Sequence, residues 1–477
     1  MGNMCGSALP ADVSHRYHLQ CGRASLMLFG SDQYGTPIYA RALKRRMSPL
    51  ALARQGHARI LEELRALNII PTKFCKTTCP AHCEFVNATL RRLRSANLTR
   101  KTRVFDRFCR DCDLTLTNRL IAGACPNCRH DATEDWCSHC ARLIVASELL
   151  EPRCAQCGGR DILQNSRNGQ ALVLSRPEDA KVFVKGFANL KAPWLANLRP
   201  FELSRAIPWG VQHEILRNSR VYVWFEALCG YQRLVREFVE IADLGRVCRR
   251  YYFGKDNVFH HVIVLQNIMR GAGYGAPDAM YVRQFVLAKN GRMSKKLDTG
   301  EFASRLIALG AHSDGLRLYL CSIDPLGGDT TYDRAAFEAF YNGVYCGNLC
   351  NLWSRYSGLM DGHAVKQVHF RPSVDFSRLR ELHADSRLQD LCAAIVAKAA
   401  AANKYISAKA LWREESKPLI QELAGQILDL THYLNPVCPG LSGEILKAHG
   451  LATPPLTFAK LAYTPSRPFI YGKIGGR

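Results

Sequence analysis

Four consecutive Cys-x-x-Cys pairs lie between residues 109 and 157, and they constrain this chain more than any other feature. A Cys-x-x-Cys turn places two sulfur atoms about 3.5 to 4 Å apart on one side of a tight loop, so two such turns complete a closed tetrahedral metal site. Eight thiols at this spacing are enough for two all-cysteine sites, and we predict two structural zinc ions. The pairs are Cys109/Cys112, Cys125/Cys128, Cys137/Cys140 and Cys154/Cys157.

The spacing between the pairs predicts how they share the two metals. Eight residues separate Cys128 from Cys137, and longer segments flank this inner unit on both sides. Because a shorter loop costs less entropy to close, we expect the two inner pairs to hold one metal and the two outer pairs the other. Redox dithiols or disulfides are the alternative, but four pairs of identical spacing fit metal geometry better. The nesting predicts an insert whose two ends lie close together.

The charge of the chain indicates a polyanionic partner. Its 64 lysine and arginine residues and 41 acidic residues give a net charge of +23. This charge is larger than solubility requires. A solvated basic surface is the alternative explanation. No run approaches the roughly 20 apolar residues that span a bilayer, so no membrane partner is expected. Cysteines scattered outside the cluster suit free thiols in a reducing compartment, which predicts a cytoplasmic location.

The hydrophobic pattern predicts an α/β domain that the cysteine segment divides. Apolar residues at helical spacing over residues 5–17 precede the run Leu26–Phe29, which predicts a buried parallel strand followed by Asp32. Polar residues just beyond the carboxyl end of a strand are where open α/β sheets bind ligands. Further helices are expected near residues 49–67 and 81–96, and further strands at residues 221–224 and 282–287.

From residue 335 to residue 450 the pattern predicts long helices, such as Leu391–Tyr405, and no convincing strands. The expected fold class is α/β: a parallel-sheet domain split by a zinc-binding insert and followed by an all-α bundle. The expected boundaries are 1–98 and 177–334 for the two parts of the α/β domain, 99–176 for the insert, 335–465 for the bundle and 466–477 for a tail. Cys75, Cys79 and Cys83 are expected on one helical face rather than at a metal.

A basic segment, Gly291–Lys296, follows an expected strand and is suited to holding a polyphosphate. It resembles the KMSKS loop of class I aminoacyl-tRNA synthetases. With the segments described below, the resemblance becomes specific to the methionyl-tRNA synthetase family and runs over nearly the whole chain. It implies a Rossmann-like catalytic domain, a catalytic role for Lys295, and ATP contacts from Met293, Ser294 and Lys295.

Two segments and one further histidine resemble the methionine site of that family. In Gly30–Ile38 the resemblance implies that Asp32 holds the amino group of methionine. Tyr222–Tyr231 is similar to the pocket segment and implies contacts from Trp224, Ala227 and Tyr231, while His261 is implied to close the pocket. A thioether lacks a strong hydrogen-bonding group, so shape and soft aromatic contacts must select it.

Three segments resemble the parts of the family that bind ATP or act in catalysis. Gly254–His261 is similar to a family segment in which Gly254 and Asp256 would contact ATP, with the aspartate on the ribose. Ser204–Gly210 resembles a family segment and implies a catalytic Arg205, although Ala206 stands where an acid is usual. Gly2 and Asn3 match the end of the His-x-Gly-His/Asn signature and are implied to contact ATP.

The helical part resembles the anticodon-binding bundle of the family. Asn351 and Arg355, one helical turn apart, and Trp412 match its anticodon-reading residues. A tryptophan can stack on an unpaired base, and two side chains one turn apart can reach base edges together. Residues 109–158 are similar to the four-pair form of the family's connective insert.

The chain departs from the family pattern at its start. The first histidine of the signature and the strand before it are absent, so we expect a clipped N-terminus. Leu228 replaces a proline of the pocket segment, and Lys296 replaces the last serine of the KMSKS pattern.

The implied activity is that of a methionine–tRNA ligase. Methionine attacks the α-phosphate of ATP, with Mg²⁺ on the phosphates, and the methionyl group then passes to the end of methionine tRNA. Positioning and charge stabilisation supply the catalysis. The rival hypothesis is a catalytically impaired homologue that acts as a tRNA-binding protein, and methionine-dependent pyrophosphate exchange distinguishes the two.

Overall fold

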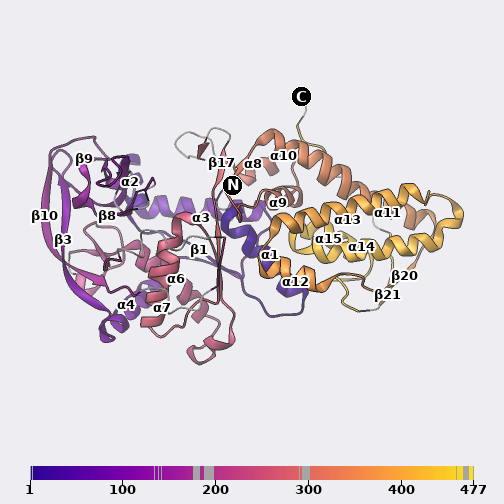
Figure 1. Ribbon diagram of the computed structural model, residues 1–477, viewed down its shortest axis with the longest axis horizontal. Coiled ribbons are helices and arrows are strands. Elements are labelled where there is room, and N and C mark those ends of the chain that lie inside the picture. The colour runs from indigo at the N-terminus through magenta and orange to yellow at the C-terminus, as the bar shows by residue number, and fades with distance from the viewer. Residues whose placement is uncertain are drawn as a thin grey trace.

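The computed structural model is elongated, with an α/β region between a β-rich unit at one end and a helical bundle at the other (Figure 1). It describes residues 2, 4–133, 135–137, 139–140, 142–175, 183–186, 198–216, 218–288, 291–292, 301–457, 459–465 and 472–475. Within these residues, no helix is both long and apolar enough to cross a bilayer.

The first α/β segment has the expected order of elements. A π-helical turn η1 (Met4–Ala8) leads into α1 (Leu9–Gln20), whose Leu9, Val13 and Tyr17 are buried at helical spacing. Strand β1 (Leu28–Ser31) is parallel to β2 (Lys73–Lys76) and begins two residues later than predicted. Helices α2 (Thr36–Arg45), α3 (Pro49–Ala66) and α4 (Pro80–Ser95) follow, and Ser48 caps α3 by accepting a hydrogen bond from the Ala51 amide.

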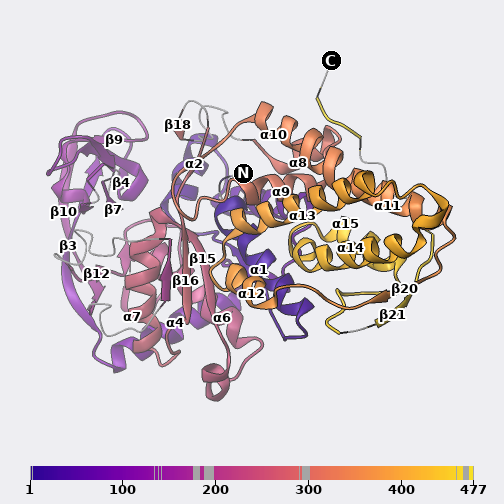
Figure 2. The ribbon, with the colours of Figure 1, turned by 45° about the vertical axis from the view of Figure 1, so that its right-hand side comes forward.

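The second α/β segment contains a parallel sheet in the order β11 (Phe183–Lys185), β16 (Ala279–Arg283), β15 (Arg250–Gly254). The π-helix η8 (Phe259–Leu265) and helix α7 (Gln266–Gly271) cover one face of this sheet, and η1 and α1 pack against β15 (Figure 2). The remaining elements here are β13 (Ser204–Arg205), η5 (Glu214–Leu216), β14 (Arg220–Val221), α6 (Val223–Arg236), η6 (Ile241–Arg246) and η7 (Lys255–Asn257).

Two strand predictions need correction in this region. The predicted strand at residues 221–224 is wrong, because β14 ends at Val221 and α6 begins at Val223. Helix α6 packs on α4 and η8, and Val223 and Phe225 lie on its buried side. The strand predicted over residues 282–287 is divided into β16 and β17 (Val286–Ala288), and β17 pairs with β18 (Gly291–Arg292) and β19 (Thr330–Tyr332).

A long antiparallel ribbon carries the cysteine-rich unit away from the parallel sheets. Its strands β3 (Thr99–Cys109) and β10 (Ile162–Leu172) pair along their whole length, so the two ends of the insert are adjacent, as predicted (Figure 1). The other elements of this unit are β4 (Leu114–Leu116), η2 (Asn118–Leu120), β5 (Ile121–Ala124), β6 (Asp131–Thr133), β7 (Asp135–Trp136), β8 (Leu143–Ile144), η3 (Ala146–Glu148) and β9 (Leu150–Cys154), with β12 (Phe201–Glu202) beside β10.

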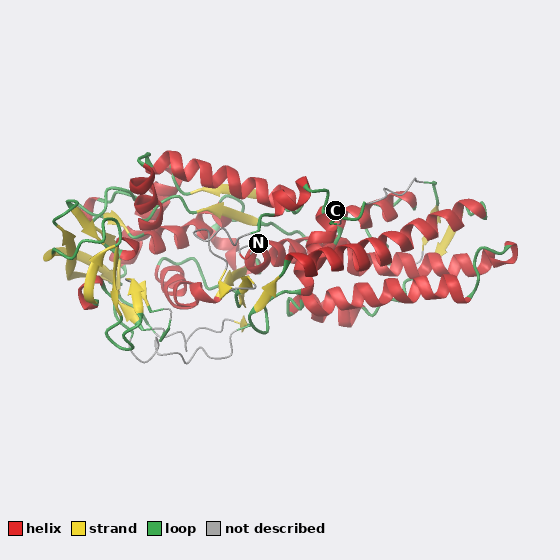
Figure 3. Ribbon diagram, turned by 90° about the horizontal axis from the view of Figure 1, so that it is seen from above, coloured by secondary structure: helices red, strands yellow, loops and turns green. Residues whose placement is uncertain are grey.

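The C-terminal part is a helical bundle (Figure 3). Its helices are α8 (Ala303–Ala308), α9 (Ser313–Ser322), α10 (Arg334–Phe340), the π-helix η9 (Tyr341–Cys350), α11 (Asn351–Gly362), α12 (Phe376–Ala384), α13 (Leu388–Ala408), η10 (Glu414–Ser416), α14 (Lys417–Val437) and α15 (Pro439–Ala448). The expectation that no strand occurs before residue 450 is wrong, because β20 (Gln367–Phe370) pairs with β21 (Ala459–Ala462). Both strands are only four residues long, and their pairing depends on a contact between distant parts of the chain.

Buried charge joins the bundle to the first helix. Arg317 of α9 is fully buried and donates to the main-chain oxygens of Val437, Leu67 and Pro436. It also pairs with Asp12 of α1 at 2.7 Å. Because each partner belongs to a different element, this one guanidinium holds α1, α3, α9 and α14 together.

Candidate functional site

The eight insert cysteines form two separate tetrads in the predicted nested arrangement. Cys109 and Cys112 meet Cys154 and Cys157, while Cys125 and Cys128 meet Cys137 and Cys140. The sulfur atoms of Cys109 and Cys157 are 3.6 Å apart, and those of Cys128 and Cys137 are 3.5 Å apart. These separations exceed a disulfide bond by more than an ångström and approach the roughly 3.8 Å edge of a tetrahedron with 2.3 Å metal–sulfur bonds.

The main chain around each tetrad also fits a thiolate–metal centre. The amides of Asn127, His139, Gln156 and Gly159 each point at the sulfur of the cysteine two residues before, at 3.3 to 3.5 Å. Such N–H groups stabilise the negative charge of a metal-bound sulfur. The predicted grouping of the eight cysteines into two nested tetrads is therefore confirmed, and each tetrad could hold a metal ion.

The expectation that Cys75, Cys79 and Cys83 share one helical face is wrong. Cys75 lies in strand β2, Cys79 precedes α4 and Cys83 is in its first turn. No group of possible metal ligands in the described part of the chain includes any of the three.

Helix α6 carries three of the predicted methionine-site residues. Trp224, Ala227 and Tyr231 recur at intervals of three and four residues, so they lie along one face of the helix. The Tyr231 hydroxyl is 3.0 Å from Nε2 of His261, which belongs to η8. The Trp224 ring stacks on His260 with ring centroids 3.8 Å apart. The structure thus pairs Tyr231 with His261 and Trp224 with His260 between the same two helices, and the sequence did not reveal the part of His260.

Asp32 follows β1, and its side chain reaches solvent. Glu226 of α6 is fully buried. Desolvation by the surrounding protein and the nearby Glu226 carboxyl raise the pKa of Asp32 well above its usual range. Nε2 of His82, on α4, is 2.5 Å from Oε2 of Glu226. Sequence reasoning missed Glu226 and His82, since the only available signal was an acid two residues after Trp224.

Gly254 and Asp256 lie at the carboxyl end of β15, where ligands bind in open α/β sheets. Asp256 is exposed, and a Cβ atom at Gly254 would lie 2.8 Å from its Oδ1. A side chain at position 254 would therefore displace the carboxylate. The neighbouring Lys255 instead points to Asp329, with Nζ 2.6 Å from Oδ1.

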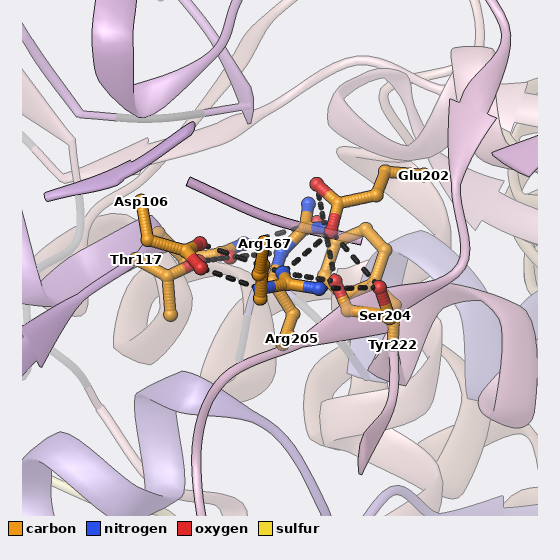
Figure 4. A network of polar contacts seen from close by, with 8 residues as sticks. Asp106, Thr117, Arg167, Glu202, Ser204, Arg205 and Tyr222 are labelled. Atoms are coloured by element: carbon orange, nitrogen blue, oxygen red, sulfur yellow. Dashed lines mark hydrogen bonds and ion pairs between the residues drawn. The ribbon is translucent and has the colours of Figure 1, made fainter. Parts of the chain in front are cut away.

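Arg205 is buried in a polar network between the α/β region and the insert (Figure 4). Its Nε donates to Asn118 Oδ1 at 3.0 Å, its Nη1 pairs with Glu202 at 2.9 Å, and its guanidinium lies 3.6 Å from the Tyr222 ring centroid. The amide of Asn118 in turn donates to the Tyr222 hydroxyl. Arg167 of β10 joins the same network through Glu202 and Asp106. These contacts fix the base of the insert against β13.

The predicted anticodon residues lie in the bundle, remote from the α/β sheets (Figure 1). Asn351 is exposed at the start of α11. Arg355, one turn later, donates to Asn403 and Ser407 of α13 at 2.9 to 3.2 Å. Trp412 follows α13 and is 61% exposed. An indole this open is available for stacking.

Several predicted ATP contacts fall outside the described residues, namely Asn3, Met293, Ser294 and Lys295. Gly2 is described, and the structure leaves open space around its Cα.

Comparison with known proteins identifies the family of the chain. A family model described as tRNA synthetases class I (M) matches residues 1–357. Among the relatives of this chain, the methionine–tRNA ligases of Pyrobaculum arsenaticum, Picrophilus torridus and Methanobrevibacter smithii are 28%, 26% and 24% identical to it in sequence. The alignments cover 98%, 95% and 95% of this chain and 89%, 70% and 74% of those proteins, respectively.

A solved structure has the same architecture. The Mycobacterium tuberculosis methionyl-tRNA synthetase bound by methionyl-adenylate superposes with a TM-score of 0.74 over 98% of this chain and 95% of that one. At 18% sequence identity this likeness concerns the fold. Because the family model matches three quarters of the sequence, the chain belongs to the class I (M) family of tRNA synthetases.

Proposed function

We propose that the chain is a methionine–tRNA ligase, which activates L-methionine with ATP and transfers the methionyl group to methionine tRNA. The observation that carries this proposal is the pairing of Tyr231 with His261 and of Trp224 with His260 between α6 and η8, in a chain whose curated relatives are methionine–tRNA ligases. Aromatic faces suit a thioether, and a carboxylate suits the ammonium group.

Each residue has a defined part in the proposed reaction. Asp32 holds the ammonium, while Trp224, Ala227, Tyr231 and His261 surround the side chain. Gly254 lets the main chain approach ATP, and Asp256 accepts hydrogen bonds from the ribose hydroxyls. Lys295, with Met293 and Ser294, neutralises the phosphates, whose Mg²⁺ arrives with the nucleotide; Gly2 and Asn3 line the adenine side.

The proposed role of Arg205 is to hold the active site against the insert, through the contacts to Asn118 and Glu202. The eight insert cysteines hold two zinc ions that close this unit and supply no reactive position, because all four ligands of each ion come from the protein. The proposed division into catalytic parts 1–98 and 177–334, insert 99–176 and bundle 335–465 matches these roles.

The tRNA is proposed to contact both ends of the molecule. Its acceptor end reaches the α/β region, and its anticodon reaches Asn351, Arg355 and Trp412. The excess of basic residues supports a polyanionic partner of this size.

Methionine-dependent exchange of pyrophosphate into ATP tests the activation step. We expect exchange with methionine and at least a hundredfold less with leucine or isoleucine, because branched side chains do not fit an aromatic slot shaped for a linear thioether. Charging of a methionine tRNA transcript tests the second step. Exchange that depends on another amino acid, or no exchange with any, would overturn the proposal.

A further inference from the structure

A small pocket lies between α4 and the segment that precedes β14, and the proposed reaction does not use it. Its volume is about 270 Å³, and its walls come from Asn87, Arg91, Gln212, His213 and Glu214. The first two residues belong to α4, and Glu214 begins η5. Drug-sized ligands occupy pockets of roughly 300 to 1,000 Å³, so this pocket suits one small chemical group.

His213 presents an N–H group to this pocket without a partner for it. The residue is 6% exposed, and its Nδ1 accepts a hydrogen bond from the main-chain amide of Ile215 at 3.1 Å. The hydrogen of the ring is therefore on Nε2. Nε2 is buried and has no hydrogen-bond acceptor in the described part of the chain; the main-chain oxygen of Asn87 lies near the ring without forming a hydrogen bond. A buried donor without a partner costs free energy, so this N–H favours a ligand with an acceptor oxygen.

Asn87 presents the complementary group. Its Oδ1 is also buried, and among the described residues no donor reaches it. A ligand that satisfies both atoms must accept from Nε2–H of His213 and donate to Oδ1 of Asn87, which a hydroxyl group does and an ionised phosphate does not. The wall of the pocket holds one cation, Arg91, and one anion, Glu214, so it favours a neutral group of this kind.

Unpaired cations lie next to the pocket. Arg91 and Arg94 are one turn apart near the end of α4, and Arg100 and Lys101 stand at the start of β3, which begins four residues after the helix ends. All four side chains are exposed, and none forms an ion pair within the ranges that the structure describes. Helix α4 contacts β3 at the base of the ribbon (Figure 1). Exposed cations in a row bind a polyanion through its phosphates.

We infer that this surface binds the backbone of RNA. A ribose 2′-hydroxyl enters the pocket between Nε2 of His213 and Oδ1 of Asn87, and the neighbouring phosphates lie on the cations of α4 and β3. The 2′-hydroxyl both donates and accepts, and it is the group by which a protein distinguishes RNA from DNA. Arg91 and Gln212 are exposed, and exposed side chains change rotamer within nanoseconds, so these two walls do not bar entry.

The inference rests on the proposed function for the identity of the RNA, which is the tRNA that the ligase charges. Helix α4 begins beside the proposed methionine site, because Cys83 of its first turn has its Sγ 3.5 Å from the hydroxyl of Tyr34, two residues after Asp32. Asn87 is one turn further along the helix, a rise of about 6 Å. RNA held at the pocket therefore passes close to the active site, as the acceptor end of a charged tRNA must.

Competition between RNA and DNA strands tests the part of the hydroxyl. Two single strands of the same sequence, about 12 nucleotides long, one RNA and one DNA, compete with a methionine tRNA transcript for the full chain in a filter assay. We expect Asn87→Ala to reduce the preference for RNA over DNA about fivefold, the effect of one lost hydrogen bond, with the affinity for DNA unchanged within about twofold. His213→Asn should do the same, and its side chain still accepts from the amide two residues on, so the local turn is kept.

The salt dependence of binding tests the part of the cations. Arg91→Gln should weaken RNA and DNA equally and lower the slope of log Kd against log salt concentration by about one. Asn87→Ala should leave that slope unchanged, because it removes no charge. Arg54→Gln is the matched control, since Arg54 is an exposed arginine on α3, and it should keep both the slope and the preference.

Methionine-dependent pyrophosphate exchange, measured on the same proteins, separates this inference from the proposed function. It should be the same in all four variants, because none of the changed residues takes part in activation. An unchanged preference for RNA in both Asn87→Ala and His213→Asn would mean that water alone satisfies the two buried atoms. That result would overturn the inference and leave the proposed function standing. Loss of the preference in a chain that shows no exchange with methionine would support the RNA site and overturn the proposed ligase.

Discussion

At the scale of single residues, His261 is fixed in one tautomer by its two neighbours. Its Nδ1 is 3.0 Å from the main-chain oxygen of Asn257, which only accepts, so Nδ1 carries the hydrogen. Nε2 then accepts from the Tyr231 hydroxyl. Burial lowers the pKa of His261 to about 4, so the ring is neutral at physiological pH and presents an uncharged surface to its ligand.

Tyr231→Phe should leave Nε2 of His261 without its donor. A lost buried hydrogen bond costs about 1 to 2 kcal/mol, so we expect the KM for methionine in pyrophosphate exchange to rise about tenfold with a smaller change in kcat. Tyr251→Phe is the control, because Tyr251 packs edge-on against Tyr231 but bonds Gln232 rather than His261. An unchanged KM in Tyr231→Phe would show that the hydrogen bond between Tyr231 and His261 has no part in methionine binding.

Gly254→Ala should disturb the nucleotide and spare the amino acid. The added methyl group would meet Oδ1 of Asp256 at 2.8 Å and push the carboxylate from its position. We expect the KM for ATP to rise by roughly tenfold, about 1.4 kcal/mol, while methionine affinity measured without ATP stays the same. Gly245→Ala, where a Cβ meets nothing within 4 Å, should behave as the wild type.

At the scale of elements, the insert is two small metal-closed units at the end of a two-stranded ribbon. Short strands such as β5 and β6 bury little apolar surface by themselves, so ligand bonds must supply much of their stability. The ribbon strands β3 and β10 pair continuously and do not depend on the inner tetrad.

Removing one tetrad should therefore leave the other intact. We expect two zinc ions per chain in elemental analysis, one in Cys125→Ser and one in Cys109→Ser, with the Cys125→Ser protein still folded along the ribbon. One zinc ion or none in reduced wild-type protein would contradict the two-site assignment. Loss of both ions from Cys125→Ser would instead mean that the tetrads fold as one unit.

The loop after α13 gives a second prediction at this scale. Trp412→Ala removes a large exposed aromatic surface, and a stacked base is typically worth about 1 to 3 kcal/mol. Binding of methionine tRNA in a filter assay should weaken by one to two decades, with pyrophosphate exchange unchanged. Leu456→Ala, an exposed apolar residue in another loop of the same domain, is the matched control. Equal effects of the two substitutions would exclude a specific role for Trp412.

At the scale of the whole molecule, buried neutral histidines make the fold sensitive to acid. The pKa of His82 and of His432 is lowered to about 4, and that of His383 to about 3, chiefly by burial. An unfolded histidine takes up its proton near pH 6.5, so the unfolded state gains protons first as the pH falls. Stability is therefore lost below about pH 6.5, by roughly 1.4 kcal/mol per pH unit for each such histidine.

His383→Phe should reduce this acid sensitivity. His383 stacks on Tyr17 of α1 with ring centroids 3.8 Å apart, and a phenyl ring keeps that contact without titrating. Between pH 7 and pH 5.5 we expect the unfolding free energy of the variant to fall about 1.4 kcal/mol less than that of the wild type. Urea unfolding followed by circular dichroism at both pH values measures the difference. Parallel losses in the two proteins would show that His383 does not carry the effect.

Elements whose signals are local could be predicted from the amino-acid sequence alone. The four cysteine pairs determine both the number of tetrads and their nested pairing, because loop length decides which turns can meet. Helical spacing locates α3, α4 and α13. The match to family segments selects Asp32, Trp224, Tyr231 and His261 from the sequence.

Features that depend on partners distant in the chain are set by tertiary packing. Residues 221–224 have the composition of a strand, yet α6, which packs against α4 and η8, already begins at Val223. His82 contacts Glu226 across 144 positions of the chain. Arg317 likewise pairs with Asp12, which is far from it in sequence. No local pattern marks such residues. Whether a histidine or arginine is buried, and which group binds it, depends on parts of the chain that only the fold brings together.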